Sequence, residues 1–192
     1  MSRKTRLLSL LIAIVAGFFI FFSLQKKDFF EPEKEITQSI EGQNEQIDVS
    51  LQEGTNANYI IYLDESRYKI VKGEEVDVIT TIDPLPENYP PVSLEIKQIA
   101  NQKPEDVLRE LEATLKQNFP DLRPVETVTE PVEGYLLHGI DGNEPTSIVV
   151  HAYVISNGKE GSFILQGNYF LEAAEGHGAR FHHMLETFEI VE

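Results

Sequence analysis

The most hydrophobic part of the chain is an uncharged stretch near its start. Leu7 to Leu24 carries no charged residue and is rich in Leu, Ile, Val and Phe. A helix over these 18 residues spans ~27 Å, close to the hydrocarbon thickness of a bilayer. Basic residues precede it, and Lys26 and Lys27 follow it. The pattern predicts one transmembrane helix within an N-terminal segment of residues 1–27.

The residues around this stretch favour an uncleaved signal anchor over a cleaved signal peptide. Small residues in an A-x-A-like pattern mark a cleavage site, but Ser23 to Lys27 reads Ser-Leu-Gln-Lys-Lys. Arg3, Lys4 and Arg6 lie on the amino-terminal side, and basic flanks of this kind stay in the cytoplasm. We expect a single-pass protein of the cell membrane, with its N-terminus inside and its C-terminal domain extracytoplasmic.

Residues 28–55 show no sustained helical or strand period. Acidic residues alternate there with Gln, Ser, Asn and Gly. Such a composition buries too little apolar surface to offset the entropy of ordering the chain. The pattern predicts an acidic, solvated linker. Ile47, Val49 and Leu51 alternate like a short strand, so the end of this linker can join the fold.

From residue 56 the pattern predicts a folded domain that continues to residue 192. Short apolar runs, rich in β-branched and aromatic residues, alternate with polar breaks, as is typical of strands joined by turns. A proline-rich loop over residues 84–91 interrupts the series, because proline cannot donate to a strand ladder. The predicted strands are Tyr59–Leu63, Tyr68–Val71, Val76–Ile82, Val92–Ala100, Val125–Val132, Tyr135–Ile140, Thr146–Ser156 and Gly161–Tyr169.

Two amphipathic helices accompany these strands. The first is predicted over Pro104–Asn118, where proline suits a first helical turn, and the second over roughly Glu172–Thr187. Thr146–Ser156 is apolar on both faces, which indicates covering layers on both sides of the sheet, or at least a central position in it. The pattern therefore predicts an α+β fold, with a mostly antiparallel sheet flanked by two helices.

Three features of this domain resemble the PsbP-like and DcrB-like family. One is a proline-bounded strand leading into Pro104–Asn118, and another is the hairpin pair around Gly142 and Gly158. The third is the ending, in which Gly167–Phe170 runs into Arg180–Phe188. The resemblance covers residues 47–192. It implies an α/β/α sandwich and a binding, stabilising or accessory protein that is not an enzyme, and it transfers no catalytic or metal-binding residue.

Composition and charge narrow the function classes. The chain has no cysteine, so thiolate metal sites, disulfides and cysteine nucleophiles are excluded. The net charge is −16, and residues 25–192 hold 32 acidic against 13 basic residues. This balance argues against binding nucleic acid, which requires a surplus of Lys and Arg, and against adhesion to anionic headgroups.

Two groups of residues are candidates for a site. Leu85 and Tyr89 offer apolar side chains in the proline-rich loop, which suggests a loop that docks a partner protein. His182, His183 and Glu186 lie within five residues near the end of the second helix and could supply metal ligands, although no HExxH pattern is present. A solvated surface group is the simpler interpretation of these three.

The remaining histidines and the overall pattern point away from catalysis. His138 and His151 fall on neighbouring strands of a predicted hairpin, where a cross-strand pair is expected. We expect no cofactor and no enzymatic activity. The leading hypothesis is a membrane-anchored extracytoplasmic binding or accessory module that acts by docking an unknown protein partner. The alternative is an extracytoplasmic metal- or small-ligand-binding protein.

Overall fold

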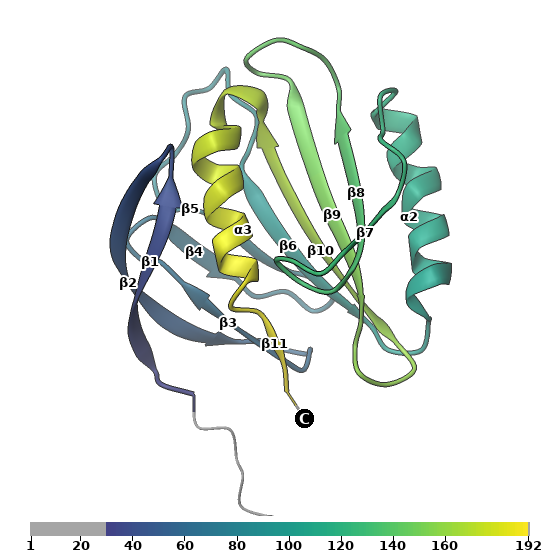
Figure 1. Ribbon diagram of the computed structural model, residues 1–192, viewed down its shortest axis with the longest axis horizontal. Coiled ribbons are helices and arrows are strands. Elements are labelled where there is room, and N and C mark those ends of the chain that lie inside the picture. Colours follow the sequence, from purple (N-terminus) through teal and green to yellow (C-terminus); the bar gives the residue numbers. More distant parts are fainter. Residues whose placement is uncertain (1–29, 192) are drawn as a thin grey trace, which may run out of the picture. The chain divides into compact units, whose positions relative to one another are not determined.

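A seven-stranded antiparallel sheet forms the centre of the fold (Figure 1). The computed structural model describes residues 30–191. The strand order is β4-β5-β6-β10-β9-β8-β7. All seven strands lie where the hydropathy pattern predicts strands, so the α+β class is confirmed. The strands are β4 (Tyr68–Val71), β5 (Asp77–Thr81), β6 (Ser93–Ile99), β7 (Glu126–Val128), β8 (Gly134–Ile140), β9 (Ile148–Ser156) and β10 (Ser162–Phe170).

The predicted membrane segment, Leu7 to Leu24, lies outside the described residues. Within residues 30–191, no helix combines the length and apolar composition needed to cross a bilayer. The chain from Pro32 onward forms one folded unit. The prediction of an anchor in residues 1–27 therefore stays a prediction.

Strand β9 is apolar on both faces and is covered on both, as predicted. Val150 and Ala152 join a core under α2 (Pro104–Asn118), and both are fully buried. Val149 and Tyr153 point to the opposite face, into the larger core. Pairing with β8 and β10 satisfies the backbone of β9 on both sides. The two cores therefore lie on opposite faces of one sheet.

Helix α2 covers the first face (Figure 1). Glu105 and Asp106 in its first turn complement the positive end of the helix dipole. Its apolar side packs Leu115 and Phe119 onto β8 and β9. Phe119 comes so close to Gly139 that a Cβ there would lie 2.8 Å from the Cβ of Phe119. Glycine in β8 therefore sets the distance between helix and sheet.

The second face is covered by a segment that begins less regularly than predicted. In place of one helix over Glu172–Thr187, a 3₁₀ turn η1 (Leu171–Ala173) and a π-helical turn η2 (Ala174–Gly178) precede α3 (Ala179–Leu185). The cause is a close approach, because a Cβ at Gly178 would lie 2.9 Å from the Tyr169 ring. The core residues of α3 are Phe181, Met184 and Leu185.

A second, four-stranded sheet completes the cover of this face, and it corrects the predicted linker. Its order is β1-β2-β3-β11, and α3 contacts both β1 and β3. Residues 33–53, predicted to be a solvated tether within 28–55, form its first hairpin. The folded domain thus begins at β1 and not at residue 56. The strands are β1 (Glu33–Ile40), β2 (Gln43–Glu53), β3 (Tyr59–Leu63) and β11 (Glu189–Ile190).

Polar residues at inward positions hid this hairpin. The more buried positions of β1 are Lys34, Ile36, Gln38 and Ile40, so half of the inner side is polar. The Lys34 ammonium lies 3.6 Å from the centre of the Tyr62 ring, where a cation–π contact replaces an apolar one. Exposed and more buried positions therefore alternate along β1, although polar and apolar residues do not.

A charged cluster ties the hairpin to the rest of the fold. Nη2 of Arg180 at the start of α3 donates to both carboxylate oxygens of Glu45 in β2, at 3.0 and 2.9 Å. Arg67, in the β3–β4 turn, lies 3.7 Å from Glu45 and 2.7 Å from Asp64. The Arg180 side chain is only 15% exposed and that of Glu45 is 32% exposed, so this ion pair is partly shielded from solvent.

The hairpin turn supplies a test of this corrected boundary. Glu41 and Gly42 both have positive φ, at 52° and 74°, as a type I′ turn requires. We expect Gly42→Ala to lower the free energy of unfolding by about 1 kcal/mol, because alanine is strained in this region. Glu41→Gly removes the same strain at the neighbouring position and should raise the stability. Thermal melts of the full chain in mild detergent measure both shifts. If residues 33–53 were a solvated tether, neither variant would change the melting temperature.

Candidate functional site

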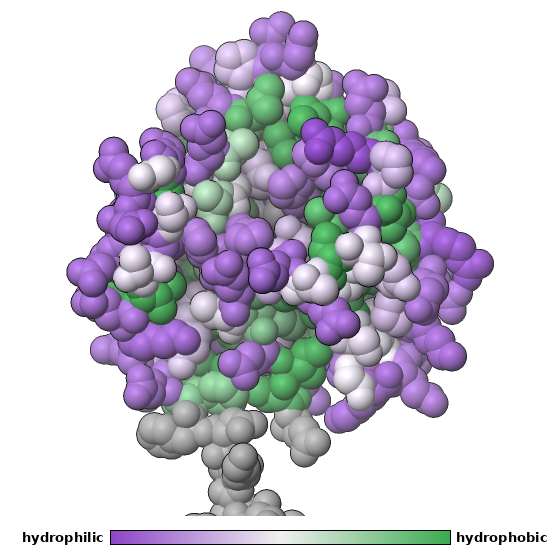
Figure 2. Space-filling model, viewed as in Figure 1, coloured by the Kyte–Doolittle hydropathy of each residue, from purple (hydrophilic) through white to green (hydrophobic). Residues whose placement is uncertain are grey.

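A large open groove lies at one end of the seven-stranded sheet. We call it the terminal groove, and its volume is about 800 Å³. Hydrophobic surface gathers in this part of the molecule, at the lower end of the view, where Figure 1 shows β11 (Figure 2). Four segments line the groove: the start of α2 (Pro104 and Glu105), the chain from Thr127 to Tyr135, the end of β9 (Val154 to Gly158) and Phe188 to Ile190.

The floor of the terminal groove is the edge of the larger core. Val132, Ile155 and Phe188 are 5–8% exposed and belong to that core. Phe188 is held by two rings at 5.3 Å, stacked on Tyr59 and edge-on to Phe163. Such aromatic pairs fix ring orientation as well as burying area. The floor is therefore preformed by packing and not by the groove's occupant.

The rim of the terminal groove is polar and acidic. Glu105, Glu133 and Glu189 are exposed and come from α2, the β7–β8 connection and β11 respectively. The hydroxyl of Tyr135 lies 3.4 Å from Glu105. Ile190, on the same rim, is 41% exposed and is one of the few large apolar side chains left in solvent. Apolar floor and polar rim together resemble the usual layout of a protein-binding surface.

The structure places the proline-rich loop differently from the prediction. Leu85 and Tyr89 are half-buried and pack against the larger core, and the Tyr89 ring lies 4.8 Å from that of Phe170. The exposed apolar side chain in this region is Ile82. A shallow hollow of about 410 Å³ lies beside the loop. Docking through Leu85 and Tyr89 stays a prediction, but these side chains already have partners within the fold.

His182, His183 and Glu186 do come together on α3. Nδ1 of His183 lies 2.9 Å from one Glu186 oxygen, and Nε2 of His182 lies 3.6 Å from the other. Nε2 of His183 faces the carbonyl oxygen of Ser39 at 3.2 Å. Both nitrogens of His183 thus meet acceptors in the protein. Among residues 30–191, no group of three or more His, Asp or Glu side chains is arranged to hold a metal ion.

His138 and His151 are direct cross-strand partners in β8 and β9, as predicted. Their ring centres are 4.3 Å apart, and Nδ1 of His151 is 3.0 Å from the Tyr169 hydroxyl. Burial, with the positive charges of His138, Arg123 and His182, lowers the pKa of His151 to about 4. Burial and Arg123 also lower the pKa of His138, whose buried Nε2 has no hydrogen-bond partner in the described residues. The pair is therefore neutral at pH 7.

His177 is a third histidine whose pKa is lowered. Nδ1 of His177 in η2 is 2.7 Å from the hydroxyl of Tyr68 in β4. Burial and the nearby Arg180 lower the pKa of His177. Three neutral histidines thus lie between the seven-stranded sheet and the segment that covers it.

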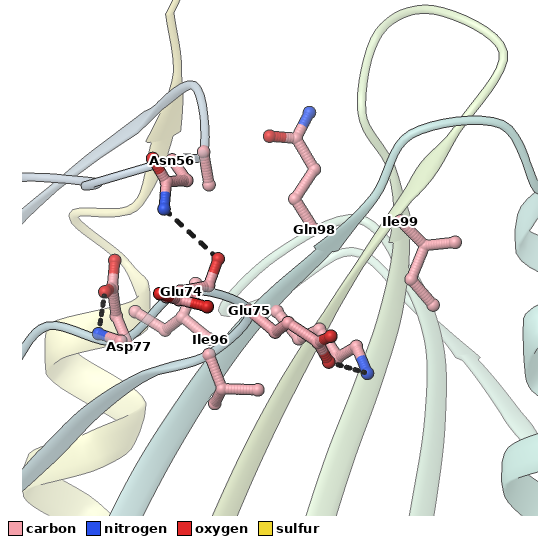
Figure 3. A pocket seen from close by; sticks show the side chains of 11 residues that line it. Asn56, Glu74, Glu75, Asp77, Ile96, Gln98 and Ile99 are labelled. Carbon is pink, nitrogen blue, oxygen red and sulfur yellow. Dashed lines mark hydrogen bonds and ion pairs between the residues drawn. The ribbon is translucent and has the colours of Figure 1, made fainter.

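A smaller pocket of about 270 Å³ surrounds Asp77, at the start of β5 (Figure 3). The Asp77 carboxylate is 4% exposed and accepts hydrogen bonds from the Tyr59 hydroxyl at 2.7 Å and from the Gly73 and Thr55 amides at 3.1 and 3.3 Å. Burial and the neighbouring carboxylate strongly raise the pKa of Tyr59. Asp77 therefore joins two loops to the larger core, which is a structural role.

The terminal groove was not predictable from local patterns, because its residues are far apart along the chain. Asp77 was also missed, since one acid among so many has no distinguishing neighbourhood in the sequence. Compared with models of known protein families and with curated protein sequences, the chain matches none. The groove is therefore assessed on its geometry alone.

The three half-buried histidines His138, His151 and His177 predict loss of stability in mild acid. Their folded pKa values lie below the ordinary value of 6.5, so the unfolded chain binds more protons just below pH 6.5, and for His151 this window extends to about pH 4. The free energy of unfolding should fall across this window as pH drops, by up to ~1.4 kcal/mol per pH unit from His151. Urea unfolding of the full chain at about pH 7.5, 6.5, 5.5 and 5.0 measures how the free energy of unfolding changes with pH.

Two variants test whether His151 causes this dependence of stability on pH. His151→Gln should flatten it, because the side chain with the most strongly lowered pKa no longer titrates. Tyr169→Phe removes the hydrogen bond to His151 but keeps all three histidines, so it should lower stability and keep the slope. An unchanged slope in His151→Gln would contradict the assignment.

Asp77→Asn should lower the free energy of unfolding by about 1–3 kcal/mol, because one amide NH₂ then faces a buried donor. Thermal melting of the full chain measures the loss, expected as a drop of roughly 2–10 °C. Asp83→Asn removes the same charge from an exposed position and should leave the melting temperature unchanged. Equal effects of the two variants would show that Asp77 has no special role.

Proposed function

We propose that this protein is a membrane-anchored extracytoplasmic binding or accessory module that docks a partner protein in the terminal groove. The observation that carries this proposal is the groove itself, an open hollow of about 800 Å³ with an apolar floor and a polar rim. The floor residues are rigid because each is also part of the larger core.

The position of Ile190 supports docking over a purely structural groove. A side chain of this size, 41% exposed beside three buried apolar residues, extends the floor into solvent. Apolar surface left open next to a preformed hollow is a common mark of an interaction site. Leu85 and Tyr89 supply no comparable surface, since both pack inward.

The anchor is the second part of the proposal. Leu7 to Leu24 has the length and composition of a membrane span, and the folded domain begins at Glu33. The connection is therefore the eight residues 25–32. Fully extended, they reach at most ~28 Å, so an anchored domain stays close to the membrane. Its docking partner would be found at the same surface. The resemblance to PsbP-like and DcrB-like proteins is consistent with this accessory role and is part of the same proposal.

Site-specific photocrosslinking in native membranes tests the docking site. A photoreactive amino acid at Thr129 or Ile190 should give a defined adduct, whereas one at Thr114, exposed on α2, should give none. Ile190→Glu should abolish the adduct formed from Thr129. Val71→Glu, which adds the same charge at an exposed apolar position outside the groove, should preserve it. Adducts from Ile82 in place of Thr129 would move the docking site to the proline-rich loop.

A reporter fused to the C-terminus tests the topology. An enzyme that is active only outside the cytoplasm should be active in this fusion and remain with the membrane fraction after a carbonate wash. Replacing Leu11 and Val15 with arginine should release the protein from the membrane, because each charge at mid-bilayer costs ~3 kcal/mol. Reporter activity confined to the cytoplasm would refute the extracytoplasmic location.

A further inference from the structure

The charge around the terminal groove differs from that of the other hollows. Its lining includes Glu105, Glu133 and Glu189 and no Lys, Arg or His. The Asp77 pocket contains Lys97, which pairs with Glu75, and the hollow beside the proline-rich loop contains Lys69. The groove is therefore the one of these three hollows whose acidic charge is not offset by a basic residue of its own lining.

The three glutamates are also free of ion pairs. No salt bridge within residues 30–191 involves Glu105, Glu133 or Glu189. Within these residues, the only side-chain hydrogen bond to any of the three is that of the Tyr135 hydroxyl to Glu105, at 3.4 Å. They come from three separate segments, so their convergence on one rim is a product of the fold. Three exposed carboxylates around an apolar floor attract a cationic ligand and repel anionic ones.

The strands at the groove favour an extended ligand. β7 and β11 are the outermost strands of their sheets, and each pairs on one side only. Residues of both strands line the groove. An extended segment can add its backbone to such an edge, and its side chains then alternate between the floor and the rim. Alternation matches the groove, which is apolar below and acidic at its margin.

We propose that the terminal groove receives an extended segment of a second protein in which apolar residues alternate with Lys or Arg. This inference rests on the docking function proposed above and specifies the chemistry of the partner. The apolar side chains contact Val132, Ile155 and Phe188, and the basic side chains meet the glutamates of the rim. Anionic lipid headgroups and nucleic acids are repelled by the same rim.

Selection from a random peptide library tests the proposal. The full chain in lipid nanodiscs is used to select phage-displayed 12-residue peptides, a length of roughly 40 Å when extended. We expect enriched peptides with apolar residues interleaved with Lys or Arg. The strongest is then synthesised, and its dissociation constant is measured by fluorescence anisotropy. Enrichment of acidic or uncharged peptides, or no enrichment, would overturn the proposal.

Charge variants then locate the binding. The triple variant Glu105→Gln, Glu133→Gln, Glu189→Gln should weaken peptide binding at least tenfold, because it removes the three charges that meet the basic side chains of the peptide. The control Asp121→Asn, Glu144→Gln, Glu160→Gln removes three exposed charges elsewhere and should keep the affinity. Equal weakening in both variants would mean attraction by net charge alone and would overturn the site.

Two further outcomes separate this inference from the docking function. Groove adducts in membranes, combined with acidic or uncharged selected peptides, would overturn the basic partner and leave docking in place. Absence of groove adducts would overturn docking itself. A synthetic peptide of residues 20–29 of this chain, which ends an apolar run with Lys26 and Lys27, is the competitor. If it displaces the selected peptide at similar concentration, the occupant is this chain and not a second protein.

Discussion

The fold depends on one constraint, which is that β9, within the seven-stranded sheet, is apolar on both faces and needs cover on both. On one face α2 is long enough to do this alone, and Gly139 lets it approach closely. On the other face α3 has only seven residues. The four-stranded sheet supplies the missing area, and the shielded ion pair between Glu45 and Arg180 holds its hairpin against α3.

The same constraint explains which elements the sequence could predict. β9 and α2 pack directly against apolar surface, so their buried positions are occupied by regularly spaced hydrophobic residues. Both elements were therefore predicted at the right positions in the chain. β1 packs through Lys34 and Gln38 as well as Ile36, and a hydropathy pattern counts two of these three as solvent-facing. The remaining signal in the sequence was the Glu41-Gly42 pair, whose φ values are both positive in the structure. A Glu-Gly pair indicates a hairpin turn less strongly than an Asn-Gly pair does.

The candidate site lies where the cover of the second face ends. Past Leu185 the chain leaves α3, and Phe188 and the β7–β8 connection line the groove beside the last apolar residues of β9. No local sequence pattern predicts where this covering layer ends, because its end depends on the three-dimensional arrangement of segments that are distant in the chain. Composition predicted an acidic domain but not three rim glutamates in a lining without Lys, Arg or His. That arrangement joins residues 28 and 56 positions apart along the chain.

Stability and docking share one segment of the chain. His151 and Tyr169 lie beneath α3, and Phe188, three residues beyond α3, forms part of both the larger core and the groove floor. A change that loosens α3 therefore also displaces the floor of the groove. Substitution of Phe188 confounds binding with unfolding, because its ring stacks on Tyr59 and meets Phe163 edge-on. Ile190 is largely free of this coupling, since its side chain leaves the core and meets solvent.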